Sequence, residues 1–181
     1  MASELYVETL KGLTSGANAN KVIIPSGQTL YAPGHVLQAV QQQVSTTVTY
    51  TGNDVDSGFN PSITPSSSSS KILIMCSLTF YMLRQDGGNE LGVGFKLKRS
   101  IGGVASDILE VNDNGRGAMQ LETNASQTDL RIRTRPSIMY LDSPNTTSEV
   151  TYLLSGLLYS GTAYMHPNSV PGQMVLMEIA G

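Results

Sequence analysis

The stretch from Ser66 to Leu83 constrains the fold more than any other part of the sequence. A run of serines leads directly into the longest apolar stretch of the chain, SSSSSKILIMCSLTFYML. About a dozen extended residues are enough for a strand to cross a small sandwich or barrel. Read with the period of two that a strand imposes, one face of this stretch consists of Ile72, Ile74, Cys76, Leu78, Phe80 and Met82.

The other face of this predicted central strand is also mostly apolar. A strand buried on one side only alternates apolar and polar residues, so we expect the sandwich core on one face and a neighbouring subunit or a covering loop on the other. The residues expected at a subunit contact are Leu73, Met75, Tyr81 and Leu83. A buried helix is the alternative, because periodicity alone does not classify a short apolar run, although Ile, Thr, Phe and Tyr favour a strand.

Length and composition indicate a single turn-rich β-domain with a short appendage. The chain has 181 residues, which is enough to bury a core without disulfides. Only 14% of the residues are charged, against about 25% in an average protein. The formal net charge of -3 provides no broad positive field, so we expect no nucleic-acid partner.

One local run of arginines departs from this pattern. Arg131, Arg133 and Arg135 alternate along a predicted strand, so all three point to one face. A solvated or salt-bridged strand face is the simpler interpretation, and anion binding is the alternative.

The single cysteine and the N-terminus bear on where the protein is made. Cys76 has no partner for an internal disulfide, and its place in the apolar strand predicts a small core residue. The opening MASELYVETLKG lacks the features of a signal peptide, and no segment approaches the length of a membrane span. We therefore expect synthesis in a cytoplasm, without membrane insertion.

Residues 1 to 33 read as an arm. Their apolar residues lie in short runs separated by GLTSGANAN and followed by PSGQTLYAPG, which is too little apolar surface for an independent core. The arm must dock on its own domain, on the arms of neighbouring copies, or on a larger particle. Its apolar candidates for such a contact are Leu5, Val7, Val22, Ile23 and Ile24.

Residues 34 to 181 predict a succession of strands. We expect one long, bulged strand in GHVLQAVQQQVSTTVTYT, an irregular loop from Gly52 to Ser70, and a hairpin through Asp86-Gly87-Gly88 that pairs the central strand with LGVGFKLKR. In that partner strand Leu91, Val93, Phe95 and Leu97 face inward.

The later strands are shorter or interrupted. Pro136 breaks DLRIRTRPSIMYLDSP, which predicts an edge or a bulge, and strands follow at EVTYLLSGLLYS and QMVLMEIAG. In the last strand we expect Val175, Met177 and Ile179 to face inward. Eight or nine short strands with turn signals at sandwich spacing predict an antiparallel β-sandwich of jelly-roll type.

No catalytic motif stands out in the sequence. His35 and His166 have no nucleophile or acid at motif spacing, and two histidines with one cysteine fall short of a zinc site unless carboxylates complete it. A pair such as Glu110 with Asp113 or Asp142 is the remaining arrangement for an enzyme that hydrolyses polysaccharide. We expect no enzyme, no metal and no cofactor.

Three segments carry a family resemblance: ITPSSSSSKILIMCSLTF (63 to 80), YLDSPNTTSEVTYLLSG (140 to 156) and VLMEIAG (175 to 181). As an ordered set they resemble the C-terminal β-domain that recurs in tail-fibre and other virion structural proteins of tailed phages, especially marine and cyanobacterial ones. The opening 27 residues, MASELYVETLKGLTSGANANKVIIPSG, resemble the attachment segments of such proteins. The chain lacks the shaft of repeats found in long fibres.

The resemblance implies a virion protein made in the host cytoplasm. It would be a short homotrimeric head fibre, capsid knob or tail component, anchored to other capsid or tail proteins by residues 1 to 33. The alternative is a receptor-binding module that grips a host-surface glycan through the loops 52 to 62 and 112 to 128, where the only aromatic residue is Phe59.

Overall fold

The computed structural model describes residues 8–12, 14–17, 19, 21–24, 26, 32–85, 88–115, 117–123 and 129–181. The chain separates into two units, Met1–Ala32 and Pro33–Gly181. The described residues of the first unit contain turns but no strand or helix. No helix among the described residues is long and apolar enough to cross a membrane.

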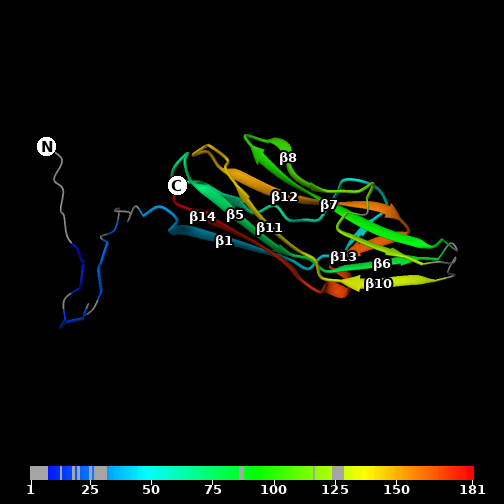
Figure 1. Ribbon diagram of the computed structural model, residues 1–181, viewed down its shortest axis with the longest axis horizontal. Helices are drawn as coiled ribbons and strands as arrows, with labels where there is room; N and C mark the ends of the chain where they lie inside the picture. The colour runs from blue at the N-terminus through cyan, green and yellow to red at the C-terminus, as the bar shows by residue number, and fades with distance from the viewer. Residues whose placement is uncertain are drawn as a thin grey trace. The chain divides into compact units, whose positions relative to one another are not determined.

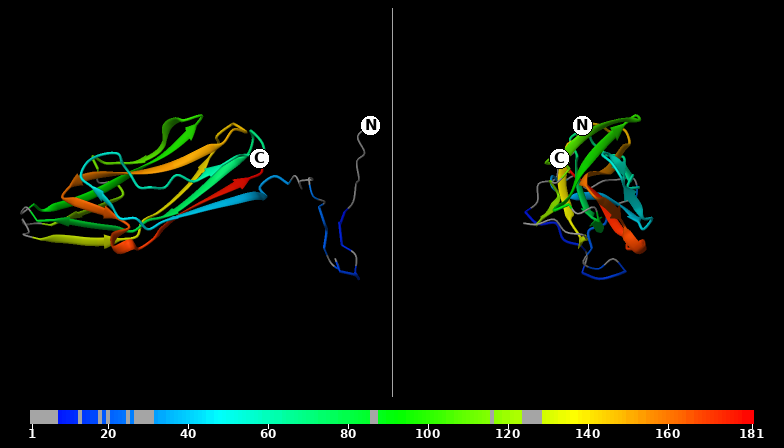
Figure 2. Two further views of the ribbon diagram at one scale, coloured as in Figure 1. Left: turned by 180° about the vertical axis from the view of Figure 1, so that it is seen from behind. Right: turned by 90° about the vertical axis from the view of Figure 1, so that its right-hand side faces the viewer.

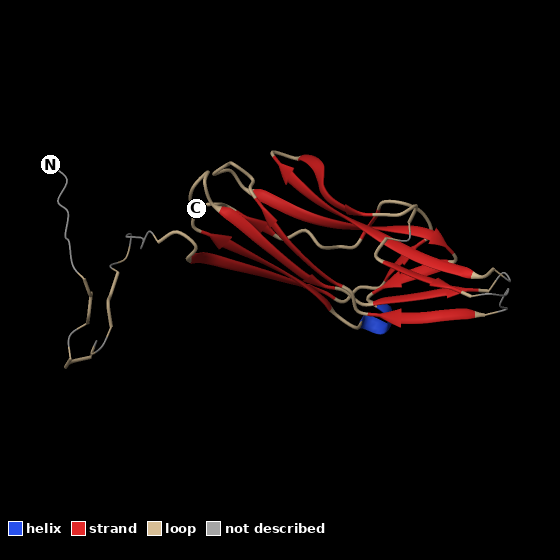
Figure 3. Cartoon of the chain, viewed as in Figure 1, coloured by secondary structure: helices blue, strands red, loops and turns tan. Residues whose placement is uncertain are grey.

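The second unit is an antiparallel β-sandwich, and four passes of the chain build its first layer (Figures 1 and 3). Each pass is divided into two strands, so we call this layer the split sheet. The passes are β1 (Val36–Val44) with β2 (Val48–Tyr50), β5 (Lys71–Ser77) with β6 (Phe80–Arg84), β10 (Leu130–Thr134) with β11 (Ser137–Asp142), and β13 (Thr162–Met165) with β14 (Gly172–Ile179). The order β1-β14-β5-β11 repeats as β2-β13-β6-β10 in the other half.

The opposite layer, called the second sheet, has its two longest strands in the middle. These are β7 (Glu90–Ile101) and β12 (Val150–Ser160). Beside β12 lie β3 (Val55–Asp56) and β4 (Ser62–Ile63), and beside β7 lie β8 (Val104–Val111) and β9 (Met119–Glu122). The end-on view in Figure 2 shows the two layers facing each other.

The connectivity confirms the predicted jelly roll. If the chain passes are counted in sequence order, the split sheet runs first, eighth, third, sixth, and the second sheet runs second, seventh, fourth, fifth. All pairings between neighbouring strands are antiparallel. Successive passes therefore alternate between layers in the manner of two interlocked Greek keys.

The core lies between the two sheets and confirms the inward faces predicted for the central strand and for the strand from Leu91 to Leu97. The inner positions of β5 and β6 are all buried, and so are Leu91, Val93, Phe95 and Leu97 on β7. They pack together with Tyr152 and Leu154 of β12. Cys76 belongs to this core, and burial raises the pKa of its thiol to about 12, which keeps it neutral.

The predicted central strand is two strands, because the split sheet breaks at one level in every pass. At this level the N–H of Leu78 donates to the carbonyl oxygen of Pro136 at 3.1 Å, and the N–H of His166 donates to Thr79 at 2.9 Å. Pro136 lacks an N–H and lies on the edge pass, as predicted. The first pass, predicted as one bulged strand, is likewise divided, and its register shifts between Val36 and Gln38.

Three local predictions are wrong. The last strand presents the opposite face to the core: Met174 and Leu176 are buried, and Val175 and Met177 lie on the outer face, because both faces of this strand are apolar.

The hairpin between the central strand and residues 91 to 99 does not form: β6 pairs with β10 and β13, whereas β7 lies in the second sheet beside β12. The segment that joins them crosses from one layer to the other, and its residues 86 and 87 lie outside the described part. The loop 52 to 70 is also more ordered than predicted, because β3 and β4 in it pair with β12.

Two buried carboxylates flank Ile72 in one row across the split sheet. Glu178 accepts hydrogen bonds from the N–H and hydroxyl of Ser66, both at 2.7 Å, and from the amide of Gln38 at 2.6 Å. Burial alone raises the pKa of Glu178, but these hydrogen bonds outweigh it and lower the pKa below its usual value. The serine run and the C-terminal tail are thus joined through one ionised side chain.

Asp142, on the other side of Ile72, is paired in the same way. Arg99 donates to its two oxygens at 3.0 and 3.2 Å, and the Tyr152 hydroxyl donates at 2.8 Å. Ser66, Asp142 and Glu178 all come from the three segments that carry the family resemblance. These polar residues therefore take part in the hydrogen bonds that compensate the two buried carboxylates.

Candidate functional site: the outer faces of the two sheets

The outer face of the split sheet is apolar in the half formed by β1, β14, β5 and β11. Met75 is paired across the strands with Met139 and Val175, and Leu73 is paired with Leu141 and Met177. Met139 is 73% exposed and Leu141 is 51% exposed. We call the set of six the apolar patch: Leu73, Met75, Met139, Leu141, Val175 and Met177.

The other half of this outer face is aromatic and basic. Tyr81 is paired with Tyr164 on one side and with Arg133 on the other. The two tyrosine rings stack with their centroids 5.9 Å apart, and the Arg133 guanidinium lies 5.0 Å from the centre of the Tyr81 ring. A depression of about 350 Å³ surrounds them. We call it the tyrosine cleft, and it is lined by Thr47, Tyr81, Leu83, Arg133, Tyr164, Pro167 and Asn168.

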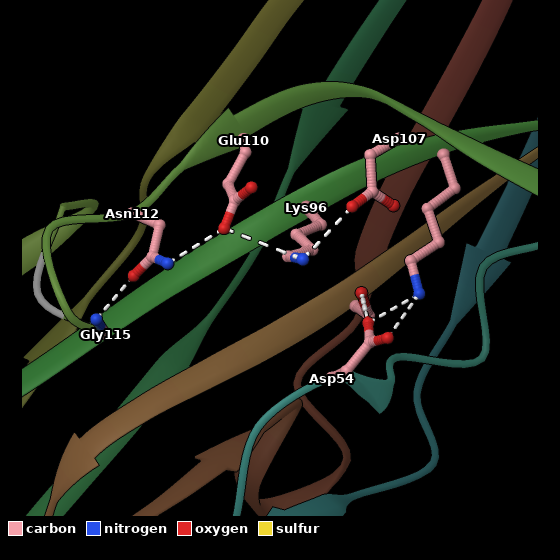
Figure 4. A network of polar contacts seen from close by, with 8 residues as sticks. Asp54, Lys96, Asp107, Glu110, Asn112 and Gly115 are labelled. Carbon is pink, nitrogen blue, oxygen red and sulfur yellow. Dashed lines mark hydrogen bonds and ion pairs between the residues drawn. The ribbon is translucent and has the colours of Figure 1, made fainter.

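The outer face of the second sheet carries paired charges instead (Figure 4). Lys96 on β7 contacts Asp107 at 3.0 Å and Glu110 at 3.6 Å, both on β8. Lys98 contacts Asp54 at 2.5 Å. We call these five residues the charged face.

Polar neighbours complete the charged face. Ser155 donates to Asp54 at 2.6 Å, and the side-chain amide of Asn112 donates to Glu110 at 2.8 Å while its oxygen accepts from the N–H of Gly115 (Figure 4). The hydrogen bond from Lys98 lowers the pKa of Asp54, and the hydrogen bond to Asp107 raises the pKa of Lys96. Each lysine of the charged face thus has a carboxylate partner, and Lys96 is shared between Asp107 and Glu110.

The structure separates Glu110 from Asp142, one of the two acids considered as its partner for hydrolysis of polysaccharide. Glu110 lies on the charged face with Lys96, whereas Asp142 is buried with Arg99 and Tyr152. Within the described residues no group of three or more His, Cys, Asp or Glu side chains could hold a metal ion.

The two histidines also lie apart from any such constellation. His35 is exposed directly before β1. His166 is buried at the break of the split sheet, edge-on to the Phe59 ring, and neither of its ring nitrogens has a hydrogen-bond partner among the described residues. Burial lowers the pKa of His166.

The four residues predicted at a subunit contact all lie on the outer face of the split sheet, but they separate into two sites. Leu73 and Met75 belong to the apolar patch, whereas Tyr81 and Leu83 belong to the tyrosine cleft. Leu5 and Val7 of the arm lie outside the described residues. Val22, Ile23 and Ile24 are exposed, with Ile23 at 54%.

Other predicted binding residues have different roles. Phe59, the one aromatic residue of the proposed glycan loops, is buried in the core. Arg131, Arg133 and Arg135 do share one exposed face. Arg131 is paired with Asp129 at 2.7 Å, and this hydrogen bond raises the pKa of its guanidinium.

Sequence reasoning missed most members of both sites on the split sheet. Met139 and Tyr164 alternate with inward residues in their own strands, so period two marks them as outward-facing. Val175 and Met177 belong to the face of the last strand that the sequence predicts as inward, so the pattern misplaces them. The sequence carries no signal for the pairing that brings them beside Met75 and Tyr81.

No protein-family model matches the sequence, and no curated protein matches it. Among solved structures, the VP2 subviral particle of infectious bursal disease virus is similar, with 12% identity and a TM-score of 0.35. The Gx strain of that virus gives 12% identity and a TM-score of 0.34. Each alignment covers 91% of this chain but only 43% and 42% of the viral chains, so this chain spans less than half of their length.

Proposed function

We propose that this protein is a virion structural protein: a short trimeric appendage, such as a head fibre, capsid knob or tail-fibre-like component. Residues 1 to 33 anchor it to other capsid or tail proteins, and residues 34 to 181 form the displayed domain. The observation that carries the proposal is the contrast between the apolar patch on one sheet and the self-paired charged face on the other.

The apolar patch supports the subunit contact. Contiguous exposed apolar surface favours contact with protein, and methionine side chains adapt to an opposing surface. Around the threefold axis of a trimer, one part of the patch on each copy contacts a different part of the patch on the next copy, and the ring closes. We therefore centre the contact on Leu73 and Met75.

The arm supports the anchoring role. Val22, Ile23 and Ile24 are consecutive and exposed, which is costly in water unless a partner covers them. A segment of this kind can add to the edge of a sheet in a neighbouring virion protein. Leu5 and Val7 extend the same apolar character toward the N-terminus.

Light scattering on the full chain and on residues 34 to 181 tests the assembly. We expect both to have the mass of a trimer, because the contact lies in the β-domain. If only the full chain is a trimer, the arm holds the copies together and its role as a free anchor is wrong. If both are monomers at micromolar concentration, the proposed subunit contact is wrong.

A glycan receptor site on the loops 52 to 62 and 112 to 128 receives no support from the described residues. Sugar sites use exposed aromatic rings, and Phe59 is buried. Aromatic side chains suited to such a contact lie on the split sheet instead.

A further inference from the structure

The tyrosine cleft has the volume and the aromatic lining of a site for a small ligand. Its volume of about 350 Å³ falls within the range of roughly 300–1,000 Å³ that such sites occupy. Its floor is the stacked pair Tyr81 and Tyr164, held by neighbouring central strands of the split sheet. A floor on paired strands is rigid, which favours a ligand with a flat apolar face.

The cleft also contains a cation without a carboxylate. The Arg133 guanidinium rests against the Tyr81 ring, and no acidic side chain of the described residues pairs with it. Arg131, one alternation away, is already neutralised by Asp129. A guanidinium binds a carboxylate through two parallel hydrogen bonds, and its stacking on a ring fixes its orientation in advance.

The rim of the cleft supplies polar groups at a fixed position. Asn168 lies in the 3-10 turn η1 (Pro167–Ser169) with a left-handed backbone, φ 55°, and its side-chain amide makes no hydrogen bond with another described residue. The Thr47 hydroxyl donates to the His166 carbonyl oxygen at 2.8 Å, so its lone pairs remain able to accept. Buried His166 ties this turn to the core.

We propose that the tyrosine cleft binds a pyranose sugar that carries a carboxylate, such as a uronic acid residue of a polysaccharide. The C–H face of the sugar ring stacks on Tyr164, whose ring face is apolar and carries negative charge density, because Arg133 and Tyr164 already lie against the Tyr81 ring. The carboxylate pairs with Arg133, and Asn168 and Thr47 hydrogen-bond the hydroxyl groups.

A single-stranded nucleic acid is the competing ligand class, since bases also stack on tyrosines beside arginines. The net charge of -3 and the single unpaired guanidinium in the cleft favour the sugar, because a phosphate backbone needs a row of cations. The site goes beyond the proposed assembly and uses the half of the outer face that the apolar patch leaves open.

Isothermal titration calorimetry with trigalacturonate on the full chain tests the site. We expect binding of trigalacturonate, binding at least about tenfold weaker for neutral maltotriose, and none for sodium acetate. Binding of acetate as strong as that of trigalacturonate overturns the sugar component. Equal or tighter binding of a six-nucleotide oligothymidylate overturns the choice of ligand class.

Variants locate the ligand. Two substitutions in the cleft, Arg133→Gln and Tyr164→Ala, should each weaken trigalacturonate binding at least about tenfold. Arg133 lies on an exposed edge strand, so its substitution should leave the fold intact. The matched controls Arg135→Gln and Tyr159→Ala alter an arginine and a tyrosine outside the cleft and should leave binding unchanged. Equal affinity in all four variants, or no binding by the wild type, overturns the proposal. Because the mass of each protein is measured in parallel, failure of the sugar site remains separate from failure of the trimer.

Discussion

The two sheets of this sandwich share one core but have opposite outer faces. On the second sheet, outward positions hold Lys96 and Lys98, each paired with carboxylates. On the split sheet, corresponding outward positions hold Leu73 and Met75. Burying apolar surface gains roughly 25 cal/mol per Å², whereas burying a charge is costly even when it is paired. The difference indicates which sheet stays in water and which one can be covered.

A charge placed in the apolar patch should produce the largest effect. We expect Met75→Glu to weaken self-association by at least about 100-fold, because an unpaired carboxylate would be buried in the contact. The domain should still fold, since the side chain lies on the outer face. Sedimentation velocity over a range of concentrations measures the change.

A matched variant on the second sheet controls for the new charge. Val104 on β8 is 75% exposed, and Val104→Glu should leave the mass unchanged. An unchanged mass in Met75→Glu as well would remove the functional contrast between the two faces.

The second largest effect should be the difference in stability loss between breaking a buried ion pair and breaking an exposed one. Asp142→Ala leaves Arg99 without its partner in a largely buried setting, and we expect a loss of about 3 kcal/mol in the free energy of unfolding in urea. Asp107→Ala on the charged face should cause no measurable loss. Equal losses for both would show that burial does not separate the two kinds of ion pair.

His166, at the break of the split sheet, should make the free energy of unfolding depend on pH. The lowered pKa of His166 in the folded state means that the unfolded chain takes up the proton first as the pH falls. Stability should be level above about pH 7 and should decrease from about pH 6.5 downward, through the lowered pKa.

Urea unfolding at pH 7.5, 6.5 and 5.5 measures this decrease. His166→Asn tolerates the left-handed backbone at this position, φ 54°. The variant should be less stable than the wild type but level across the same pH range. The same slope in wild type and variant would assign the pH dependence to another group.

The smallest effect should come from the charged face itself. Lys98→Met removes the partner of Asp54, whose side chain is nearly half exposed, and should cost less than ~1 kcal/mol at low salt. In 1 M NaCl the difference from the wild type should shrink further, because the Debye length falls to about 3 Å. A larger, salt-independent loss would show that this face is packed like a core.

Much of the fold could be predicted from the sequence because it depends on local alternation. Ile72, Ile74 and Cys76 face inward as expected, and Pro136 marks an edge. The predicted hairpin between the central strand and Leu91 failed for a physical reason. A turn with Asp86-Gly87-Gly88 permits either a return along the same sheet or a crossing to the other. The alternation from Leu91 to Leu97 specifies which side of the strand faces inward, but not which of the two sheets the strand joins.

The sequence by itself determined the class of this protein, an antiparallel jelly roll, and the inward side of the strands that contain Ile72 and Leu91. These properties follow from the period of two and from the residues of the turns, which act over a few positions. In the last strand both faces are apolar, and only the structure decided that Met174 and Leu176 face inward.

Only the tertiary structure decided which outward residues become neighbours. Met75 meets Met139 and Val175, and Tyr81 meets Tyr164 and Arg133, because distant chain passes pair in one register. That register is set by the packing of the whole core, and no local pattern specifies it.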